Sequence, residues 1–377
     1  MAITYLDHAA ATPLLPSVTA AHAELCRRYF YNPHAASQLS AECLCEVRRA
    51  ETRLLACLGL GTEDAEVVWT SGGTESLNLA ILGTILRPPA RLFVDATAHR
   101  ALLEPARAAA SQAGVTLATL PVDAKGRLDL GPPPEGAPGA LVGVGHVNNE
   151  TGAVHDLVAV RRWIERHAPG AALIVDALQS LGKLPVPWGE AALDLLAVGG
   201  RKIGGPPAVG ALIVRRGRRL RPLLHGGGQQ RGLRAGTLDT VGILEFTLAA
   251  ECACGALRAQ LARAEVLNRR LRERLAGAVR PPPVVLSPPD ASPYILSFAF
   301  PGLEGAVLMR KLAARGVIVA TGSACTAESR QSSHVLAAMG IAERTARGAL
   351  RVSFGASSQE EDVENLVREL QAALDSY

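Results

Sequence analysis

"LLAVGGRKIGGP" (residues 195–206) begins as a run of Leu, Ala and Val without polar alternation and then changes to glycines around one lysine. A short apolar run of this kind predicts a strand buried on both faces, as in a parallel sheet. Lys202 follows directly after the carboxyl end of this strand. Because ligands bind at these ends in open parallel sheets, Lys202 is a candidate reactive amine rather than a surface charge.

Further apolar runs resemble this one and are separated by helical patterns. Strands are expected at 66–70, 91–96, 140–147, 172–177 and 210–216, and helices at 75–86, 100–113 and 156–167. Strands and helices in alternation are typical of an α/β fold. The sequence therefore predicts a mostly parallel central sheet with helices on both faces.

A Pro-rich stretch at 280–293 separates this pattern from a different one. It follows a long helical segment, 244–276, and precedes a strand pattern at 294–300 and helices at 304–314 and 358–375. This order is typical of a smaller α+β domain. We expect residues 14–255 to form the large domain, and residues 1–13 together with 256–377 to form the smaller one.

Composition excludes several classes of protein. Of 377 residues, 48% are hydrophobic and 20% are charged, as in a folded globular chain. The net charge of +4 is too small to indicate nucleic-acid binding, and we interpret the arginine cluster at 215–221 as a solvated strand end or subunit edge. The N-terminus lacks the pattern of a signal peptide, and no uncharged apolar run is long enough to cross a bilayer. We therefore expect a cytoplasmic protein.

Seven cysteines are present, and an odd number in such a chain does not suggest a disulfide framework. Six of them are interpreted as small buried hydrophobic residues: Cys26, Cys43, Cys45, Cys57, Cys252 and Cys254. Cys325 differs because it lies among Gly, Ser, Ala and Thr in "TGSACTAES" (321–329), as expected for a reactive thiol in a small, polar and mobile segment.

Polar side chains follow four of the predicted strands at the point where each strand ends. His99 follows 91–96, Asn148, Asn149 and Glu150 follow 140–147, Asp176 and Gln179 stand at the end of 172–177, and Lys202 follows 195–200. A Gly-Gly-Thr turn at 72–74 then opens a helix, whose free N–H groups attract an anion. A lysine, a carboxylate and a phosphate cradle are the groups that pyridoxal phosphate requires.

Over nearly its whole length the sequence resembles the aminotransferase class V group of pyridoxal-phosphate enzymes, and within it the cysteine desulfurases of the NifS/IscS type. The matching stretches, in order, are "DHAAATP" (7–13), "NPHAAS" (32–37), "TSGGTESLNLA" (70–80), "TAHRAL" (97–102), "HVNNETG" (146–152), "VDALQSLGKLP" (175–185), "GRKIGGP" (200–206), "HGGGQQRGLRAGT" (225–237), "GSACTAES" (322–329) and "LRVSFG" (350–355).

The resemblance implies a role for each matching residue toward the cofactor. It implies that Lys202 forms the Schiff base, that Asp176 pairs with the pyridinium nitrogen, and that His99 stacks on the ring and moves protons. Gln179 would bond the ring hydroxyl, and Asn149 would lie near it. Gly73 and Thr74 would bind the phosphate. It also implies that Thr237 reaches the phosphate bound by a neighbouring subunit, and hence a homodimer.

The same resemblance implies how the substrate is bound and what reaction follows. Arg351 would clamp the substrate carboxylate, with Asn149, Asn32 and Ala11 also at the substrate site, and Cys325 would be the nucleophile. The implied reaction converts L-cysteine to L-alanine and leaves a persulfide on Cys325. An acceptor protein would then take the sulfur into iron–sulfur cluster or thio-cofactor and thio-modification pathways, with no metal, membrane or direct nucleic-acid binding.

Three alternatives to this function stay open. A selenocysteine lyase shares the same frame and differs in its substrate. Another aminotransferase or lyase of this fold would have no use for Cys325. A divergent sulfur-relay scaffold with impaired catalysis is conceivable because the lysine motif departs from the family pattern.

The departures lie around the lysine. Gly199 and Arg201 stand where the family usually has a hydroxyl residue and a histidine, both on the phosphate side of the cofactor. We hypothesise that Arg201 replaces both, since a guanidinium carries a permanent charge and several donors. The alternative is that Arg201 points to solvent or to a subunit interface. Leu178 also stands where a small or hydroxyl residue is usual.

Overall fold

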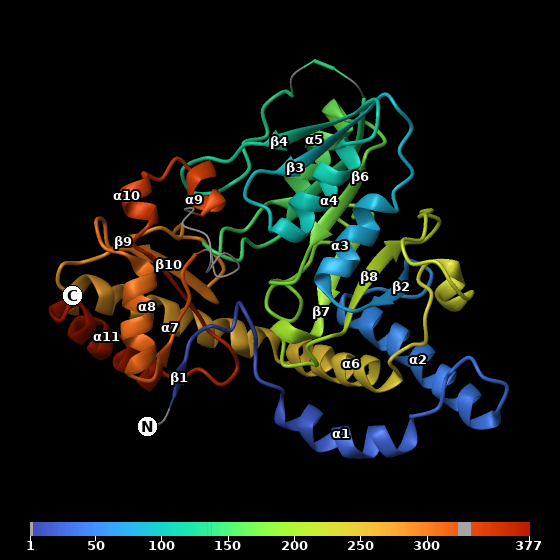
Figure 1. Cartoon of the computed structure of the whole chain (residues 1–377), viewed down its shortest axis with the longest axis horizontal. Coiled ribbons are helices and arrows are strands. Elements are labelled where there is room, and N and C mark those ends of the chain that lie inside the picture. Colours follow the sequence, from blue (N-terminus) through green and yellow to red (C-terminus); the bar gives the residue numbers. More distant parts are fainter. Residues whose placement is uncertain (1–2, 134, 137, 323–332) are drawn as a thin grey trace.

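A computed structural model describes residues 3–133, 135–136, 138–322 and 333–377 of the chain. Figure 1 shows a larger part built around a central sheet and a smaller part beside it, where both termini lie. Cys325 lies outside the described residues.

The central sheet has seven strands in the order β2-β8-β7-β6-β5-β3-β4. Their bounds are β2 Ala65–Thr70, β8 Gly210–Arg215, β7 Leu195–Gly199, β6 Ala172–Asp176, β5 Gly139–Gly145, β3 Ala90–Asp95 and β4 Val115–Leu120. The pairs from β7 to β4 are parallel, and β8 runs antiparallel to both of its neighbours. The predicted α/β fold with a mostly parallel sheet is therefore confirmed.

Helices cover both faces of this sheet because successive strand residues point to opposite sides. Val67 and Trp69 of β2 pack into the core beneath α1 (Pro16–Arg28), α2 (Gln38–Cys57), α5 (Leu157–His167) and α6 (Thr240–Gly255). Val68, between them in sequence, packs into the opposite core with α3 (Gly73–Leu82) and α4 (Arg100–Ala110). Two apolar layers thus hold the carboxyl ends of the strands in place.

Two sequence expectations need correction. Strand β4 was not expected, because only its first and last residues are buried and it lacks the continuous apolar run of a central strand. The expected helix 244–276 is two helices, α6 and α7 (Leu257–Ala278), which differ in direction by 69°. The break falls after Gly255, a residue that weakens helices.

None of the single helices in the described ranges is long and apolar enough to cross a membrane. The bent pair of α6 and α7 passes the same criterion only when both helices are taken together.

The smaller part contains an antiparallel sheet in which β10 (Ile295–Ala299) lies between β9 (Val284–Val285) and β12 (Ala349–Ser353). Helices α7, α8 (Gly305–Ala314) and α11 (Glu360–Asp375) contribute to its core. The short helices α9 (His334–Ala338) and α10 (Glu343–Ala346) complete it.

The chain's first residues return to this smaller part. Strand β1 (Thr4–Tyr5) pairs in parallel with β11 (Val317–Ile318), and Leu6 is buried in the core that contains α7, α8 and α11. We propose the division into residues 14–255 on one side, and 1–13 with 256–377 on the other, as the domain boundaries.

The interpretation of six cysteines as buried hydrophobic residues is wrong for most of them. Cys43 is buried, whereas Cys26, Cys45 and Cys252 are exposed. Cys57 and Cys254 are partly buried. The reason is geometric: residues two apart on a helix do not share a face, so burial of Cys43 turns Cys45 toward solvent.

Candidate active site

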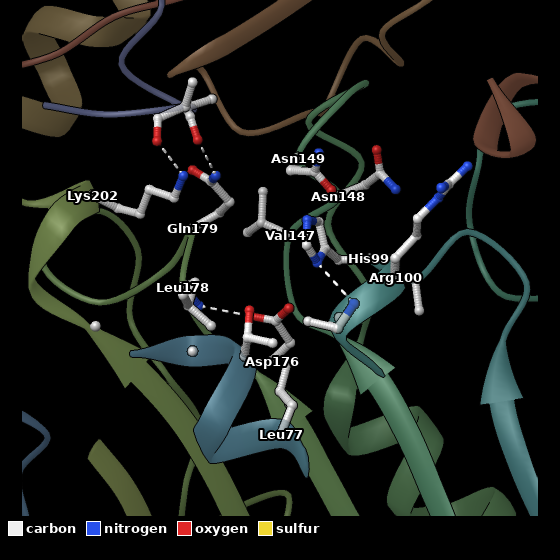
Figure 2. Close-up of a pocket in the computed structure, with 18 of the residues that line it drawn as sticks. Leu77, His99, Arg100, Val147, Asn148, Asn149, Asp176, Leu178, Gln179 and Lys202 are labelled. Atoms are coloured by element: carbon white, nitrogen blue, oxygen red, sulfur yellow. Dashed lines mark hydrogen bonds between the residues drawn. The ribbon is translucent and has the colours of Figure 1, made fainter. Parts of the chain in front are cut away.

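The carboxyl ends of β3, β5, β6 and β7 open into one cavity of about 350 Å³. Nine of the residues expected at the site line it: Gly73, Thr74, His99, Asn149, Asp176, Gln179, Arg201, Lys202 and Arg351. Figure 2 shows Lys202, Gln179, His99 and Asp176 arranged around this space. The structure thus brings together residues that lie up to 278 positions apart in the chain, from Gly73 to Arg351.

Lys202 lies on a single helical turn, Gly200–Lys202, that follows β7. Its Nζ donates a hydrogen bond to the carbonyl oxygen of Ala10, so the N-terminal segment closes one side of the cavity. Burial lowers the pKa of Lys202 to about 8, and the nearby guanidinium groups of Arg351 and Arg201 act in the same direction. An amine with this pKa has a substantial neutral, nucleophilic fraction near neutral pH.

Asp176 ends β6 and faces the same cavity. Within the described part of the chain, its carboxylate accepts one hydrogen bond, from the backbone N–H of Leu178 to Oδ1 at 3.0 Å. Burial raises the pKa of this carboxyl, while His99 and Lys202 oppose the rise. A buried carboxylate with so few donors requires a cationic partner in the cavity.

His99 caps α4 and is oriented by that role. Its Nδ1 accepts a hydrogen bond from the backbone N–H of Ala101 at 3.0 Å, which leaves Nε2 to carry the proton of the neutral ring. Burial lowers the pKa of His99, and the neighbouring Asp176 acts against this. The ring therefore lines the cavity in its neutral form at neutral pH.

The N-terminus of α3 forms the anion-binding side of the cavity. Its N-cap is Gly72 with φ of 138°, a conformation that favours glycine, and no side chain caps the first turn. Gly73, Thr74 and Glu75 line the cavity, so the free N–H groups and the positive end of the helix dipole lie at its edge. This arrangement fits a phosphate group.

The close approach at Gly73 is made by Leu178. A Cβ atom at Gly73 would collide with the Leu178 side chain, and a Cβ atom at Gly199 would lie 3.5 Å from Leu178 Cδ2. Leu178 therefore fills space beside both glycines. The two departures from the family pattern, Leu178 and Gly199, are in this way spatial neighbours.

Arg351 on β12 approaches the cavity from the smaller part of the chain. One of its terminal nitrogens donates to Oδ1 of Asp7 at 2.6 Å and the other donates to the carbonyl oxygen of Asn149 at 2.9 Å. Its Nε is buried without a hydrogen-bond partner among the described residues. Each terminal nitrogen also carries a second N–H, so the guanidinium keeps donors for a bound anion.

Asn148, next to Asn149, has a structural function instead. Its side chain accepts hydrogen bonds from the backbone N–H groups of Glu150 and Thr151, each at 2.9 Å, and donates to the carbonyl oxygen of Thr97 at 3.0 Å. These bonds fix the turn that presents Asn149 to the cavity.

Four expected site residues are not placed in the cavity by this single chain. Thr237 and Asn32 are exposed, and the side chain of Asn32 accepts from the backbone N–H of His34 at 3.0 Å. Ala11 accepts a hydrogen bond from Tyr5 through its carbonyl oxygen, and Ala9 and Ala10 line the cavity in its place. Cys325 lies outside the described residues.

The sequence places Glu150 among the polar residues that follow the strand expected at 140–147, but it assigns this residue no role. Glu150 is 5% exposed, lines the cavity, and accepts a hydrogen bond from Ser333 at 2.5 Å. Burial raises the pKa of Glu150 to about 7. A Cβ atom on Gly322 would lie 2.7 Å from the same carboxylate oxygen, so Gly322 and Ser333 both approach this group. No sequence pattern indicates this meeting, because it joins distant segments.

Lys183, four residues beyond Gln179, was also missed. It is buried, donates to Gln179 Oε1 at 3.3 Å, and lies 5.8 Å from the centre of the Tyr294 ring. Burial lowers the pKa of Lys183 to about 7, helped by the positive charges of Lys202 and Arg351. Gln179 in turn donates to the carbonyl oxygen of Ala9 at 2.9 Å. Lys183 therefore supports the residue that faces the cavity.

An amine, a buried carboxylate and a helix N-terminus around one cavity, at the strand ends of an α/β sheet, define an enzyme site built for an aromatic phosphate cofactor. The chain belongs to the aminotransferase class-V family, whose model matches residues 4–366. Membership of this family implies pyridoxal phosphate as the cofactor.

Relatives of known name cover the whole chain. The chain is 36% identical to an IscS-like cysteine desulfurase of Mycobacterium tuberculosis, over 99% of this chain and 96% of that protein. A solved NifS-like protein aligns with a TM-score of 0.89 at 28% identity, over 100% of both chains. A solved structure of SspA in complex with cysteine aligns with a TM-score of 0.78 at 28% identity, over 93% of this chain and 98% of that one.

Proposed function

We propose that this chain is a cysteine desulfurase that converts L-cysteine to L-alanine and carries the sulfur as a persulfide on Cys325. The observation that carries the proposal is that Lys202, Asp176 and the N-terminus of α3 line the same cavity. Relatives named cysteine desulfurase match the chain over nearly its full length, which supports the same activity.

The residues present fit pyridoxal phosphate. Lys202 would hold it covalently through Nζ, and the free N–H groups at Gly73 and Thr74 would hold its phosphate. Asp176, which forms no ion pair with the described residues, would pair with the ring nitrogen, and Gln179 and Asn149 would contact the ring hydroxyl. When bound, this cofactor supplies an electron-withdrawing ring that stabilises negative charge at the α-carbon of an amino acid.

Substrate orientation would depend on Arg351. Asp7 and the carbonyl oxygen of Asn149 fix two sides of its guanidinium, and each terminal nitrogen keeps a second N–H. A carboxylate bound there would be held in a defined geometry by charge-assisted hydrogen bonds. The amino group of the substrate would then face Lys202.

Protons would be moved by Lys202 and His99. Lys202, with a pKa of about 8, can exist as a neutral amine or as an ammonium ion near neutral pH, so it can take the α-proton and return a proton to the β-carbon. The neutral His99 ring, whose Nδ1 is held by the backbone N–H of Ala101, would donate its Nε2 proton at the cavity wall. Because Lys202 Nζ donates to the carbonyl oxygen of Ala10, the N-terminal segment would limit access of water to the amine from that side.

Cys325 would complete the reaction. Its thiolate attacks the sulfur of the substrate, an S–S bond forms while the Cβ–S bond of the substrate breaks, and the β-carbon takes up a proton to give alanine. The persulfide would pass to an acceptor protein that serves iron–sulfur cluster assembly or thio-modification. A homodimer, in which the exposed Thr237 reaches the partner's cofactor, is part of this proposal. The cytoplasmic location stays a prediction.

Alanine formation from L-cysteine by the purified protein tests this function. We expect release of alanine and a yellow absorbance band that shifts on addition of cysteine, with alanine lost in Lys202→Ala and in Cys325→Ser. Cys45→Ser is the matched control, since it removes an exposed thiol of α2. Full turnover by Cys325→Ser would favour an aminotransferase or another lyase, and a preference for selenocysteine would favour a selenocysteine lyase. A colourless, inactive protein would indicate a sulfur-relay scaffold.

A further inference from the structure

A second thiol site lies outside the cavity, on the outer surface formed by α1 and α6. Cys26 and His22 are four residues apart on α1, so their side chains meet on one face of the helix. Cys26 Sγ lies 3.6 Å from His22 Nε2, and His22 Nδ1 lies 2.6 Å from Glu245 Oε1 of α6. Figure 1 shows α1 and α6 running next to each other below the sheet.

The hydrogen bonds decide which atom of His22 carries the proton. An ionised carboxylate only accepts hydrogen bonds, so Glu245 takes the proton-bearing Nδ1 of the ring. Nε2 is then the acceptor that faces the thiol of Cys26. This is the order of nucleophile, base and orienting carboxylate that activates a thiol for attack.

The position of Glu245 is independent support. Glu245 is 5% exposed, and its neighbours in α6, Ile243, Leu244 and Phe246, are buried in the main core. A buried carboxylate costs free energy unless it is paired. Among the described residues, the carboxylate of Glu245 has one hydrogen-bond and ion-pair partner, His22, whose side chain is 61% exposed. The buried end of the triad is fixed, while Cys26 at its other end is exposed.

We propose that Cys26 is a second nucleophilic thiol of this chain, deprotonated by His22, and that it accepts a sulfane sulfur atom from a persulfide or polysulfide. The choice of sulfane sulfur rests on the proposed desulfurase function, because that activity produces this electrophile. The Cys26 thiolate attacks a sulfane sulfur, a new S–S bond forms, and the donor's S–S bond breaks. The rest of the donor leaves with the electron pair and takes the proton from His22, so no other oxidant is needed.

Peptide mass spectrometry can measure the reaction at each cysteine of the full-length protein. Residues 1–27 contain no lysine or arginine before Arg27, so trypsin releases Cys26 in a peptide with no other cysteine. With limiting iodoacetamide, we expect Cys26 to be alkylated at least about tenfold faster than Cys45, an exposed thiol that contacts no histidine among the described residues. His22→Gln should reduce the Cys26 rate to that of Cys45 and leave Cys45 unchanged.

Glu245→Gln gives a second variant that does not depend on removing the base. It should lower the Cys26 rate less than His22→Gln does, because the ring stays but loses its orienting charge. Equal rates for Cys26 and Cys45 in the unmodified protein, or a Cys26 rate that His22→Gln leaves unchanged, would overturn the activation of this thiol.

Inorganic polysulfide tests the class of electrophile directly. Incubation of the same protein with polysulfide, followed by alkylation, should add one sulfur atom to the Cys26 peptide and much less to the same peptide of His22→Gln. A Cys26 that is alkylated rapidly but gains no sulfur would overturn the assignment as a sulfane-sulfur acceptor. Because the donor is supplied, this outcome is distinct from a failure of the proposed desulfurase function, which alanine formation reports.

Discussion

Glu150→Gln should make the protein more stable at pH 8, although it removes a carboxylate beside the cavity. Glu150 is buried, and its pKa is raised from an ordinary 4.5 to about 7, mainly by burial, with Ser333, Arg351 and Arg100 acting against the rise. In the folded protein the group therefore stays protonated between these two pH values, while in the unfolded chain it is ionised. Stability is full below pH 4.5 and falls as pH rises to about 7.

The size of the effect follows from the pKa difference of about 2.5, which corresponds to about 3 kcal/mol. Glutamine cannot ionise, and its carbonyl oxygen can still accept the hydrogen bond from Ser333. For a chain of 377 residues, an unfolding entropy of about 0.8 kcal/mol/K converts this gain to a rise of roughly 4 °C in Tm.

Thermal unfolding of both proteins at pH 5 and at pH 8, at the same cofactor and protein concentrations, measures the difference. The Tm values should nearly coincide at pH 5, and the variant should unfold at the higher temperature at pH 8. A variant that is less stable than the parent by the same amount at both pH values would show that Glu150 is needed as a charge, and would refute the reasoning.

Three further substitutions have defined outcomes. Arg201, although exposed, lines the cavity, and Arg201→Ala should weaken retention of pyridoxal phosphate by about tenfold to a hundredfold, as expected for loss of a charge-assisted hydrogen bond. Arg219→Ala, at an exposed position away from the cavity, should leave retention unchanged. Unchanged retention of the cofactor by Arg201→Ala in a titration would place Arg201 in solvent or at an interface. Lys183→Met should raise Tm most below pH 7, because burial of the ammonium ion costs most free energy there. The gain in Tm should fade as pH rises toward the usual lysine pKa. A gain in Tm that does not depend on pH would contradict the lowered pKa of Lys183. Asp7→Asn should lower stability by roughly 2 kcal/mol, because Arg351 at 3% exposure loses its charge partner, and an unchanged Tm would contradict this.

The fold and part of the site could be predicted because their signals are local. The apolar runs that end at Asp176 and Gly199 indicate strands by themselves, and a parallel sheet then brings the residues after them to one edge. Lys202 and Asp176 were found in this way. The resemblance to a known family added Arg351, which lies in the other part of the chain and which no local pattern connects to the sheet.

The remaining features depend on contacts between distant segments. Leu178 and Gly199 are separate departures in the sequence, and only the packing of Leu178 beside Gly73 and Gly199 shows that they share one space. Burial of Glu150 against Ser333 likewise joins residues 183 positions apart. The exposed cysteines were misjudged because an Ala- and Leu-rich helix buries only one of its faces.

Mass spectrometry of the Cys325 peptide after incubation with L-cysteine tests the central claim most directly. Trypsin releases this thiol in residues 316–330, which contain no other cysteine. We expect one added sulfur atom on this peptide, with release of alanine, and neither in Lys202→Ala. Alanine without sulfur on Cys325, or sulfur on Cys325 in the Lys202→Ala protein, would contradict a desulfurase in which Lys202 and Cys325 act in sequence.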